Sequence, residues 1–282
     1  MSRWSSSRVS CYVSCPLKYK LNYIEKWAPD QPPPTSELQT KGLAFHETVE
    51  QYEEVMSKED IFKVLDEKIE KYKVDTVKYP LKPAIEKFLI FWSTLVSPKL
   101  KDGWKVDKEY WTEGAINRRP FCGALDLYLH SDNEIVIVDY KTGKNGVAAS
   151  YKNQQILYAI LEGQKRGWTN KQIAEKTKIF LFFPLMADLE SKTAEQNMLR
   201  SLKELKFEES DVNEVLQYYQ TNLQKISVED FDNAKGNLSH ECSWCQYCGA
   251  KPNKDGFIGC VQSVKAGFEM PPEINFIKKE KK

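Results

Sequence analysis

Two strand-like runs in the middle of the chain, the first interrupted by a charged residue and the second closed by two, constrain its fold more than any other feature. The runs Phe121–His130 and Glu134–Asp139 are separated by the turn-forming segment Ser131–Asn133. Apolar character alternating along strands that flank such a turn predicts a β-hairpin. Residues 135–138 are apolar throughout, which predicts that the second strand is central and buried on both faces.

Three charged side chains are predicted to converge on this hairpin. Asp139 and Lys141 are two positions apart, so they project to the same side of a strand, and Asp126 lies on the neighbouring strand. Carboxylates without thiolate or imidazole suit Mg²⁺ or Mn²⁺. A lysine beside such an ion can orient or activate water, or stabilise charge on a phosphoryl oxygen. The alternative is an ordinary charge pair at a strand end, although a charged pair that ends a buried strand needs a partner.

The whole string, G-x-x-D and then D-Y-K-T-G-K after 12 residues, resembles the nuclease motif of the PD-(D/E)XK superfamily, specifically its RecB/Cas4-like branch. The resemblance implies an α/β fold with the restriction-endonuclease-like core, in the order αβββαβ around a central mixed sheet. It also implies metal-dependent DNA cleavage. In that reaction Asp126 and Asp139 hold Mg²⁺ or Mn²⁺, and Lys141 positions or activates the attacking water.

Two further segments resemble motifs of the same branch. The string G-x-x-x-H, at Gly42–His46, opens a helix expected to run to about Met56. There the resemblance implies that His46 completes the metal site, and a neutral imidazole suits such a site. The string Y-x-x-Q-x-x-x-Y-A lies in a helix expected at 150–166 and places Gln154 and Tyr158 on one face. The resemblance implies that these two residues contact the DNA backbone or brace the catalytic lysine.

The remaining patterns predict the elements around this core. We expect helices at about 59–72 and 83–96, a first strand at Trp104–Thr112 and a buried strand at Lys178–Pro184. Family members often carry a glutamate where Glu109 stands on the first strand. We expect one nuclease domain over residues 1–282. Its parts would be a mainly helical 1–100, the nuclease core 101–190, and a helical 191–282 that includes helices through 190–235 and the cysteine cluster.

Four of the seven cysteines gather near the C-terminus. Cys242, Cys245 and Cys248 are separated by two residues each, and Cys260 follows. Thiolates at this spacing suit Zn²⁺, at ~2.3 Å, or an iron–sulfur cluster. A self-contained zinc site would use these four cysteines, with His240 as a substitute ligand.

The N-terminal segment 2–27 predicts an amphipathic helical hairpin, and its string S-x(4)-Y-x-x-C-P-x-x-Y-x-L-x-Y also resembles this nuclease branch. In the iron–sulfur members this cysteine is the first cluster ligand. The resemblance therefore implies a [4Fe–4S] cluster held by Cys15, Cys242, Cys245 and Cys260, with Cys248 as the alternative. The chain departs from the family where Lys251 occupies the position of the last cysteine, so the fourth ligand stays open.

Composition describes an ordinary globular protein. The net charge is +1, so a nucleic-acid enzyme must concentrate its basic residues locally. No apolar run approaches the ~20 residues of a membrane span, and the first residues lack the apolar core of a secretory signal. We expect a protein of the prokaryotic, or phage-infected, cytoplasm without a membrane partner. The candidates for contacting DNA are Lys18, Lys20, Arg118, Arg119 and Lys144.

The expected function is that of an exonuclease acting on single-stranded DNA or DNA ends, alongside proteins of replication, recombination or repair. Two alternatives come from other classes. A non-cleaving DNA-binding module would ordinarily have lost one of Asp126, Asp139 or Lys141, and all three are present. A zinc-stabilised scaffold protein of a recombination or replication complex would contain zinc and no iron.

Overall fold

The computed structural model describes residues 3–30, 36–143, 151–239, 242, 245–250, 252–267 and 274–279. The chain divides into two compact units. The first unit comprises Met1–Arg3 and Thr35–Leu216, and the second comprises Trp4–Pro34 and Gln217–Lys282. The expectation of one nuclease domain over the whole chain stays a prediction.

A five-stranded mixed sheet in the order β2-β3-β4-β5-β6 organises the first unit. Strands β4 and β5 are parallel and the other neighbours are antiparallel. The Ser131 N–H donates to the Glu134 carbonyl at 3.0 Å and closes the predicted turn between β3 and β4. All six residues of β4 are buried, which confirms the predicted central strand. The strands are β2 (Lys105–Ile116), β3 (Arg119–His130), β4 (Ile135–Tyr140), β5 (Thr177–Phe182) and β6 (Leu202–Glu204).

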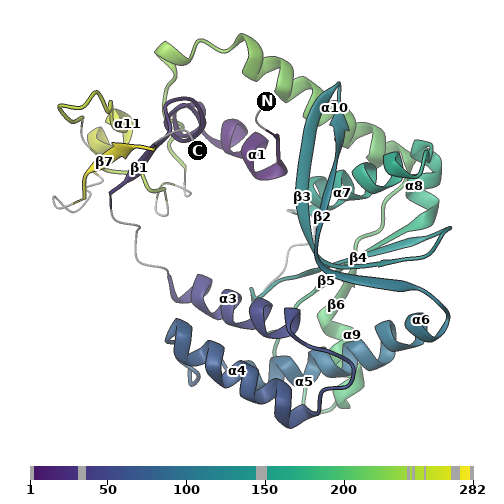
Figure 1. Cartoon of the computed structure of the whole chain (residues 1–282). Coiled ribbons are helices and arrows are strands. Elements are labelled where there is room, and N and C mark those ends of the chain that lie inside the picture. Colours follow the sequence, from purple (N-terminus) through teal and green to yellow (C-terminus); the bar gives the residue numbers. More distant parts are fainter. Residues whose placement is uncertain are drawn as a thin grey trace. The chain divides into compact units, whose positions relative to one another are not determined.

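Helices cover both faces of this sheet, as expected for the α/β nuclease fold (Figure 1). On one side, α3 and α5 bury apolar side chains against Leu127, Val138 and Phe182 of the strands. On the other side, α7 packs on β2 and β3. In the described part of the chain, no helix has the length and apolar character needed to cross a membrane. The helices are α3 (Glu37–Glu50), α4 (Lys58–Tyr72), α5 (Leu81–Phe91), the π-helix η2 (Trp92–Val96), α6 (Ser97–Lys101), α7 (Lys152–Lys165) and α8 (Asn170–Lys176).

Strand β3 belongs to the sheet for only part of its length. It pairs with β4 through Leu127–His130 alone, whereas it pairs with β2 along almost its whole length. From Asp126 to Arg119 the β2–β3 hairpin therefore leaves the sheet as a two-stranded arm (Figure 1). This divergence, which we call the fork, places Asp126 at the first position beyond the β3–β4 ladder.

Two helix predictions were wrong in their extent. Helix α3 begins at Glu37, because Ser36 caps it and Gln39 completes a capping box, and it ends at Glu50. Residues 190–235 are not helical throughout. Helices α9 (Ala194–Ser201) and α10 (Glu209–Val228) are separated by β6, whose residues pair with β5 as the edge strand.

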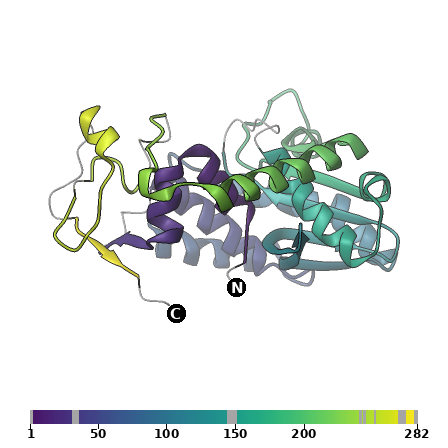
Figure 2. The ribbon, with the colours of Figure 1, turned by 90° about the horizontal axis from the view of Figure 1, so that it is seen from above.

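The second unit combines the beginning and the end of the chain. The helical prediction for its N-terminal segment is confirmed by α1 (Ser6–Ser14), α2 (Pro16–Tyr19) and the π-helix η1 (Lys20–Ile24). Strands β1 (Trp27–Pro29) and β7 (Phe276–Lys278) lie side by side and antiparallel (Figure 2). A small apolar core includes Trp27, Tyr247, Phe257 and Phe276. The unit also contains the short helices η4 (Phe231–Asn233) and α11 (Val261–Lys265).

Candidate active site

The register of three adjacent strands brings three carboxylates together. The pairs Lys108–Leu127 and Tyr110–Leu125 come directly before and after, so Glu109 of β2 lies opposite Asp126 of β3. The pair Leu127–Val138 makes Asp139 of β4 the next position opposite Asp126. Side chains at directly opposite positions are nearest neighbours across an antiparallel pair. The structure thus brings the two predicted aspartates together at the fork.

At the fork, the Asp126 carboxylate accepts a backbone hydrogen bond for which the diverging strand offers no carbonyl. The Tyr140 N–H donates to Asp126 Oδ2 at 2.6 Å. Because β3 diverges there, its backbone carbonyls no longer accept from β4, and a buried N–H needs an acceptor. This hydrogen bond fixes the carboxylate, while Asp126 Oδ1 lies 3.8 Å from His46 Nδ1.

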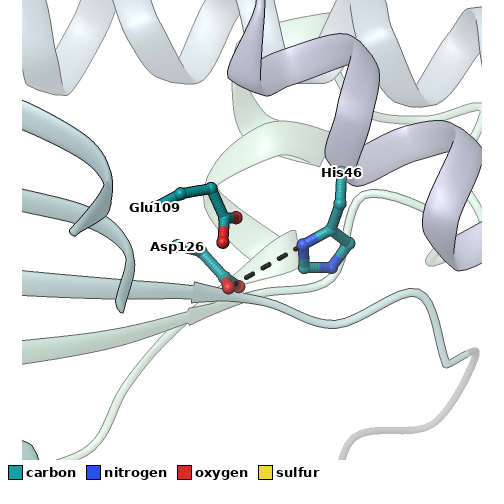
Figure 3. A group of neighbouring side chains, drawn as sticks. All are labelled: His46, Glu109 and Asp126. Atoms are coloured by element: carbon teal, nitrogen blue, oxygen red, sulfur yellow. Dashed lines mark ion pairs between the residues drawn. The ribbon is translucent and has the colours of Figure 1, made fainter. Parts of the chain in front are cut away.

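Glu109 joins this group through a distorted backbone. Its φ of 48° lies in the left-handed region, and the regular β2–β3 pairing is interrupted at this residue. Such strain is often concentrated at functional sites. His46, Glu109 and Asp126 offer ligand atoms within 4.8 Å of one another, and their side chains point toward one another in Figure 3. The sequence pointed to the position of Glu109 but contains no feature that predicts this backbone.

Asp139 and Lys141 form the second half of the site. Lys141 Nζ lies 2.5 Å from Asp139 Oδ2 and 4.4 Å from the centroid of the Tyr151 ring. The fully buried Gln155 donates from Nε2 to Asp139 Oδ1 at 2.8 Å. Within the described residues, the buried Oδ2 atom has no hydrogen bond of regular geometry. One oxygen of Asp139 is therefore held by the Gln155 amide, and the other faces the Lys141 ammonium group.

The structure assigns the bracing of the lysine and its aspartate to residues that the sequence analysis missed. Gln154 Nε2 donates to the Tyr158 hydroxyl at 2.9 Å, so the predicted pair is in contact. However, Tyr151 covers Lys141, and Gln155 holds Asp139. Tyr151 is the first residue of the string that singled out Gln154. Gln155 is the next residue on the helix, and only its orientation toward the sheet distinguishes it.

Two glycines allow the helices to approach the site. A Cβ atom at Gly123 would lie 2.2 Å from Tyr158 Cε1, so the tyrosine ring packs directly on the β3 backbone. A Cβ atom at Gly42 would lie 3.1 Å from Thr142 Oγ1. The glycine of G-x-x-D therefore lets α7 lie close to the arm. The glycine of G-x-x-x-H lets α3 bring His46 to the segment that carries Lys141.

The electrostatics of the site suit a cation. Burial raises the pKa of Asp126 far above its usual value, and the Asp139 carboxylate raises it further. Partial burial and the Asp126 carboxylate raise the pKa of Glu109. Burial lowers the pKa of His46, and the nearby carboxylates offset this only in part. Carboxylates that resist ionisation together with a neutral imidazole make a donor set that fits Mg²⁺ or Mn²⁺.

A separate pocket in the second unit gathers the cysteines. Lys18 and all five cysteines named by the sequence analysis, Cys15, Cys242, Cys245, Cys248 and Cys260, line it, and none of them forms a disulfide. The backbone N–H groups of Lys18 and Asn237 donate to Cys15 Sγ, both at 3.4 Å. Burial raises the pKa of Cys245 and of Cys248, and neighbouring thiols raise both further. Crowded thiols with backbone donors fit a bound metal or iron–sulfur cluster.

The basic residues predicted to contact DNA have different surroundings. Lys20 is buried and pairs with Glu25 at 3.4 Å, so it presents no charge to a phosphate. Lys18 lines the cysteine pocket. Arg118 occupies the exposed turn of the arm, with Arg119 beside it. Lys144 and the alternative zinc ligand His240 lie outside the described residues.

Comparison with known proteins identifies the class to which this fold and site belong. Residues 3–252 match the model of the PD-(D/E)XK nuclease superfamily, and the chain belongs to that superfamily. A protein of Eubacterium rectale, provisionally named an exonuclease, is 14% identical over 92% of both chains, with a TM-score of 0.48. The protein SSO0001 is 11% identical over 76% of this chain and 95% of its own, with a TM-score of 0.33. No curated protein matches the chain.

Proposed function

We propose that this nuclease is a Mg²⁺- or Mn²⁺-dependent deoxyribonuclease of the RecB/Cas4-like branch, acting as an exonuclease on single-stranded DNA or DNA ends. The observation that carries the proposal is the presence at the fork of two neighbouring pairs, Asp126 with His46 and Asp139 with Lys141, whose charges act on one another. A chain that had kept the fold for binding alone would have no need of two neighbouring carboxylates, one of them with its pKa raised by burial and by the other, beside an ammonium group.

The donor set assigns roles to the acidic residues and the histidine. Asp126, Asp139 and His46 would hold the divalent ion. Glu109 offers a further carboxylate oxygen, because His46, Glu109 and Asp126 have ligand atoms within 4.8 Å of one another, a group to which Asp139 does not belong. When bound, the ion supplies Lewis-acid polarisation of the scissile phosphate and stabilises charge on the leaving oxygen. The Tyr140 N–H and the Gln155 amide fix the two aspartates in position. Such supporting contacts orient metal ligands and tune their affinity.

Lys141 positions or activates the attacking water. Its ammonium group is held between the Asp139 carboxylate and the face of the Tyr151 ring. A cation fixed in this way lies beside the place where negative charge develops on the phosphoryl group. Gln154 and Tyr158, which are hydrogen-bonded to each other, contact the DNA backbone beside it.

The arm provides a surface for a single strand. Trp111 of β2 is 53% exposed and lies opposite Ala124, which is also exposed. Thr112 and Gly123 form the adjacent pair, and their side of the arm faces α7. The indole therefore lies on the side turned away from α7, two residues along the strand from Glu109. An exposed tryptophan there can stack on a base, and Arg118 at the turn can contact a phosphate.

The cysteine pocket holds a [4Fe–4S] cluster in this proposal, with Cys15, Cys242, Cys245 and Cys260 as ligands and Cys248 as the alternative. A zinc ion held at ~2.3 Å by four of these thiolates is the alternative occupant of the pocket. The cluster would bind thiolates from both ends of the chain and stabilise the second unit. The setting would be a prokaryotic or phage-infected cytoplasm, with replication or recombination proteins as partners.

Cleavage assays on DNA of different forms test this proposal. Protein purified without oxygen is incubated with Mg²⁺ or Mn²⁺ and end-labelled linear or covalently closed circular DNA, each single- and double-stranded. Metal-dependent loss of linear DNA, with circles left intact, is the expected result. Cutting of circles would make the enzyme an endonuclease. Folded, metal-loaded protein that binds DNA and cuts none of the four substrates would favour the non-cleaving DNA-binding module.

A further inference from the structure

The cysteine pocket contains one thiol more than a four-ligand cluster needs. Five cysteine side chains line it, all in the second unit. The first comes from the junction between α1 and α2, and the other four come from the C-terminal segment. Their surroundings separate the five thiols into a set of three and a set of two.

Cys15, Cys245 and Cys260 form the set of three. All three pack against the apolar core that contains Trp27, Tyr247, Phe257 and Phe276. Cys260 is only 9% exposed, and a Cβ atom at Gly236 would lie 3.4 Å from its Sγ. Two backbone N–H groups donate to Cys15 Sγ. The positions of these three sulfur atoms are thus fixed by the packing of the unit.

Cys242 and Cys248 form the set of two. They lie three residues before and three residues after Cys245. The Cys245 N–H donates to the Cys242 carbonyl at 3.2 Å, and the Cys248 N–H donates to the Cys245 carbonyl at 3.0 Å. In the part of the pocket that the structure describes, neither cysteine belongs to the apolar core that holds the other three.

Polar groups surround these two thiols instead. Cys242 Sγ lies 3.5 Å from the Ser239 nitrogen and 3.9 Å from the Asn237 carbonyl oxygen. Cys248 lies beside the buried Ser263, whose hydroxyl accepts from the Gly249 N–H and donates to the Cys260 carbonyl, both at 2.8 Å. Both thiols therefore line the pocket from polar surroundings, one on each side of Cys245 in the chain.

We propose that the fourth ligand position of the cluster is shared between Cys242 and Cys248, either of which suffices, while Cys15, Cys245 and Cys260 are indispensable. The inference rests on the cluster in the proposed function. It explains why Lys251 can occupy the position of the family's last cysteine. It also means that one thiol beside the cluster is always free, so loss of either shared ligand leaves the cluster bound.

A set of serine variants tests this assignment through cluster content. Six variants are purified without oxygen. Three remove the indispensable ligands (Cys15→Ser, Cys245→Ser and Cys260→Ser), two remove one shared ligand each (Cys242→Ser and Cys248→Ser), and the double variant removes both shared ligands. Cys122→Ser, in the first unit, is the control. Iron and acid-labile sulfide per chain and visible absorbance are measured on the folded fraction. We expect the iron content of the three variants without an indispensable ligand, and of the double variant, to fall about tenfold or more. The single variants Cys242→Ser and Cys248→Ser should each keep most of their iron.

Alkylation of the wild-type holoprotein gives a second readout that requires no variant. Iodoacetamide followed by mass spectrometry should modify Cys242 in some molecules and Cys248 in others, but not both in one molecule. The inference is overturned if either single variant loses iron as completely as Cys245→Ser, if the double variant keeps it, or if only one of the two thiols is ever alkylated.

The same experiments separate this inference from the proposed function. Wild-type protein that contains zinc and no iron would refute the cluster, and the zinc content of the same variants would then decide whether the fourth position is shared. Protein that shows the expected iron pattern but cuts no DNA would refute the nuclease activity and leave the ligand assignment intact.

Discussion

Asp126 shows how a single carboxylate can connect fold and chemistry. It accepts the backbone N–H that the diverging strand leaves unpaired, and it faces His46, Glu109 and Asp139. Without a bound cation, these carboxylates repel one another in a partly buried site. The group therefore destabilises the metal-free protein, and a bound divalent ion restores the lost stability. Such a loss of stability in favour of function is common at active sites.

Removing the charge of Asp126 should stabilise the metal-free protein. The pKa of Asp126 is raised in the folded state, so the folded protein binds the proton more tightly than the unfolded chain does. The stability that protonation confers is lost as the pH rises from the ordinary aspartate range through the raised value. At pH 8 we expect Asp126→Asn, which can still accept from Tyr140, to gain about 1–3 kcal/mol.

Thermal unfolding with and without Mn²⁺ measures this gain. Wild type should be stabilised by Mn²⁺, whereas Asp126→Asn should have the higher unfolding temperature without metal and respond little to its addition. The stability advantage of the variant should disappear at pH 4, where the wild-type carboxyl is also neutral. A variant that is less stable than wild type at pH 8, or one stabilised equally by Mn²⁺, would contradict this account.

Gln155 and its neighbour Gln154 should differ in their effects. Gln155 donates to the metal-facing Asp139, whereas Gln154 donates to the Tyr158 hydroxyl. Gln155→Leu removes the support of a metal ligand, so the Mn²⁺ concentration at half-maximal thermal stabilisation should rise about tenfold or more. Gln154→Leu should leave that concentration unchanged and weaken DNA affinity. Equal Mn²⁺ midpoints for both variants would rule out the positioning role of Gln155.

At the scale of elements, the β2–β3 hairpin is organised by contacts that α7 makes along its length. From the same helix, Gln155 bonds to Asp139, Tyr158 packs on Gly123, and the buried Glu162 accepts from the Thr112 and Tyr128 hydroxyls. These contacts hold the arm and the central strand against one helix. The fork is therefore braced on the side from which Lys141 also receives its support.

A methyl group at Gly123 tests that packing. Gly123→Ala would place Cβ 2.2 Å from Tyr158 Cε1, and overpacking of this kind costs about 1–3 kcal/mol. Tyr158→Ala removes the ring, so the clash is absent in the double variant. The losses of unfolding free energy of the two single variants should therefore sum to more than the loss of the double variant. Gly143→Ala, with nothing within 4 Å of the added atom, is the control. Strictly additive unfolding free energies would show that the ring does not pack as described.

Sequence patterns predicted some of these elements and not others, for physical reasons. The hairpin and the central strand followed from alternation and from an unbroken apolar run, because burial determines both. The capping box at Ser36 and Gln39 was visible but was not used, which shifted the predicted start of α3. The fork and the left-handed Glu109 depend on how strands twist apart. No local pattern encodes that twist.

At the scale of the whole molecule, the two proposed cofactors belong to different units. The residues proposed to hold the divalent ion lie in the first unit, and the five pocket cysteines lie in the second. Motif order along the chain predicted this set of residues. It did not predict two compact units, because compactness depends on long-range contacts that spacing along the chain does not report.

Removal of the cluster should therefore affect the second unit first. We expect oxidation and iron chelation to open Trp4–Pro34 and the segment after Gln217 to limited proteolysis, because the cluster would no longer link Cys15 to the cysteines of the C-terminal segment. The increase in unfolding temperature on adding Mn²⁺ should persist for the first unit. Peptide mapping of the cleavage products and thermal unfolding check both parts. Loss of the Mn²⁺ response together with the cluster would show that the units are not independent.

Cleavage by a lysine variant that still binds metal tests the central claim most directly. Wild type, Lys141→Ala and Lys152→Ala are compared in single-turnover cleavage of end-labelled linear DNA with Mn²⁺, and Mn²⁺ binding is verified for each. Lys152 pairs with Asp211 and serves as the control. We predict that Lys141→Ala binds Mn²⁺ and loses cleavage by about 10³-fold or more, while Lys152→Ala cuts like wild type. Cleavage by Lys141→Ala at the wild-type rate would contradict the assignment of this site.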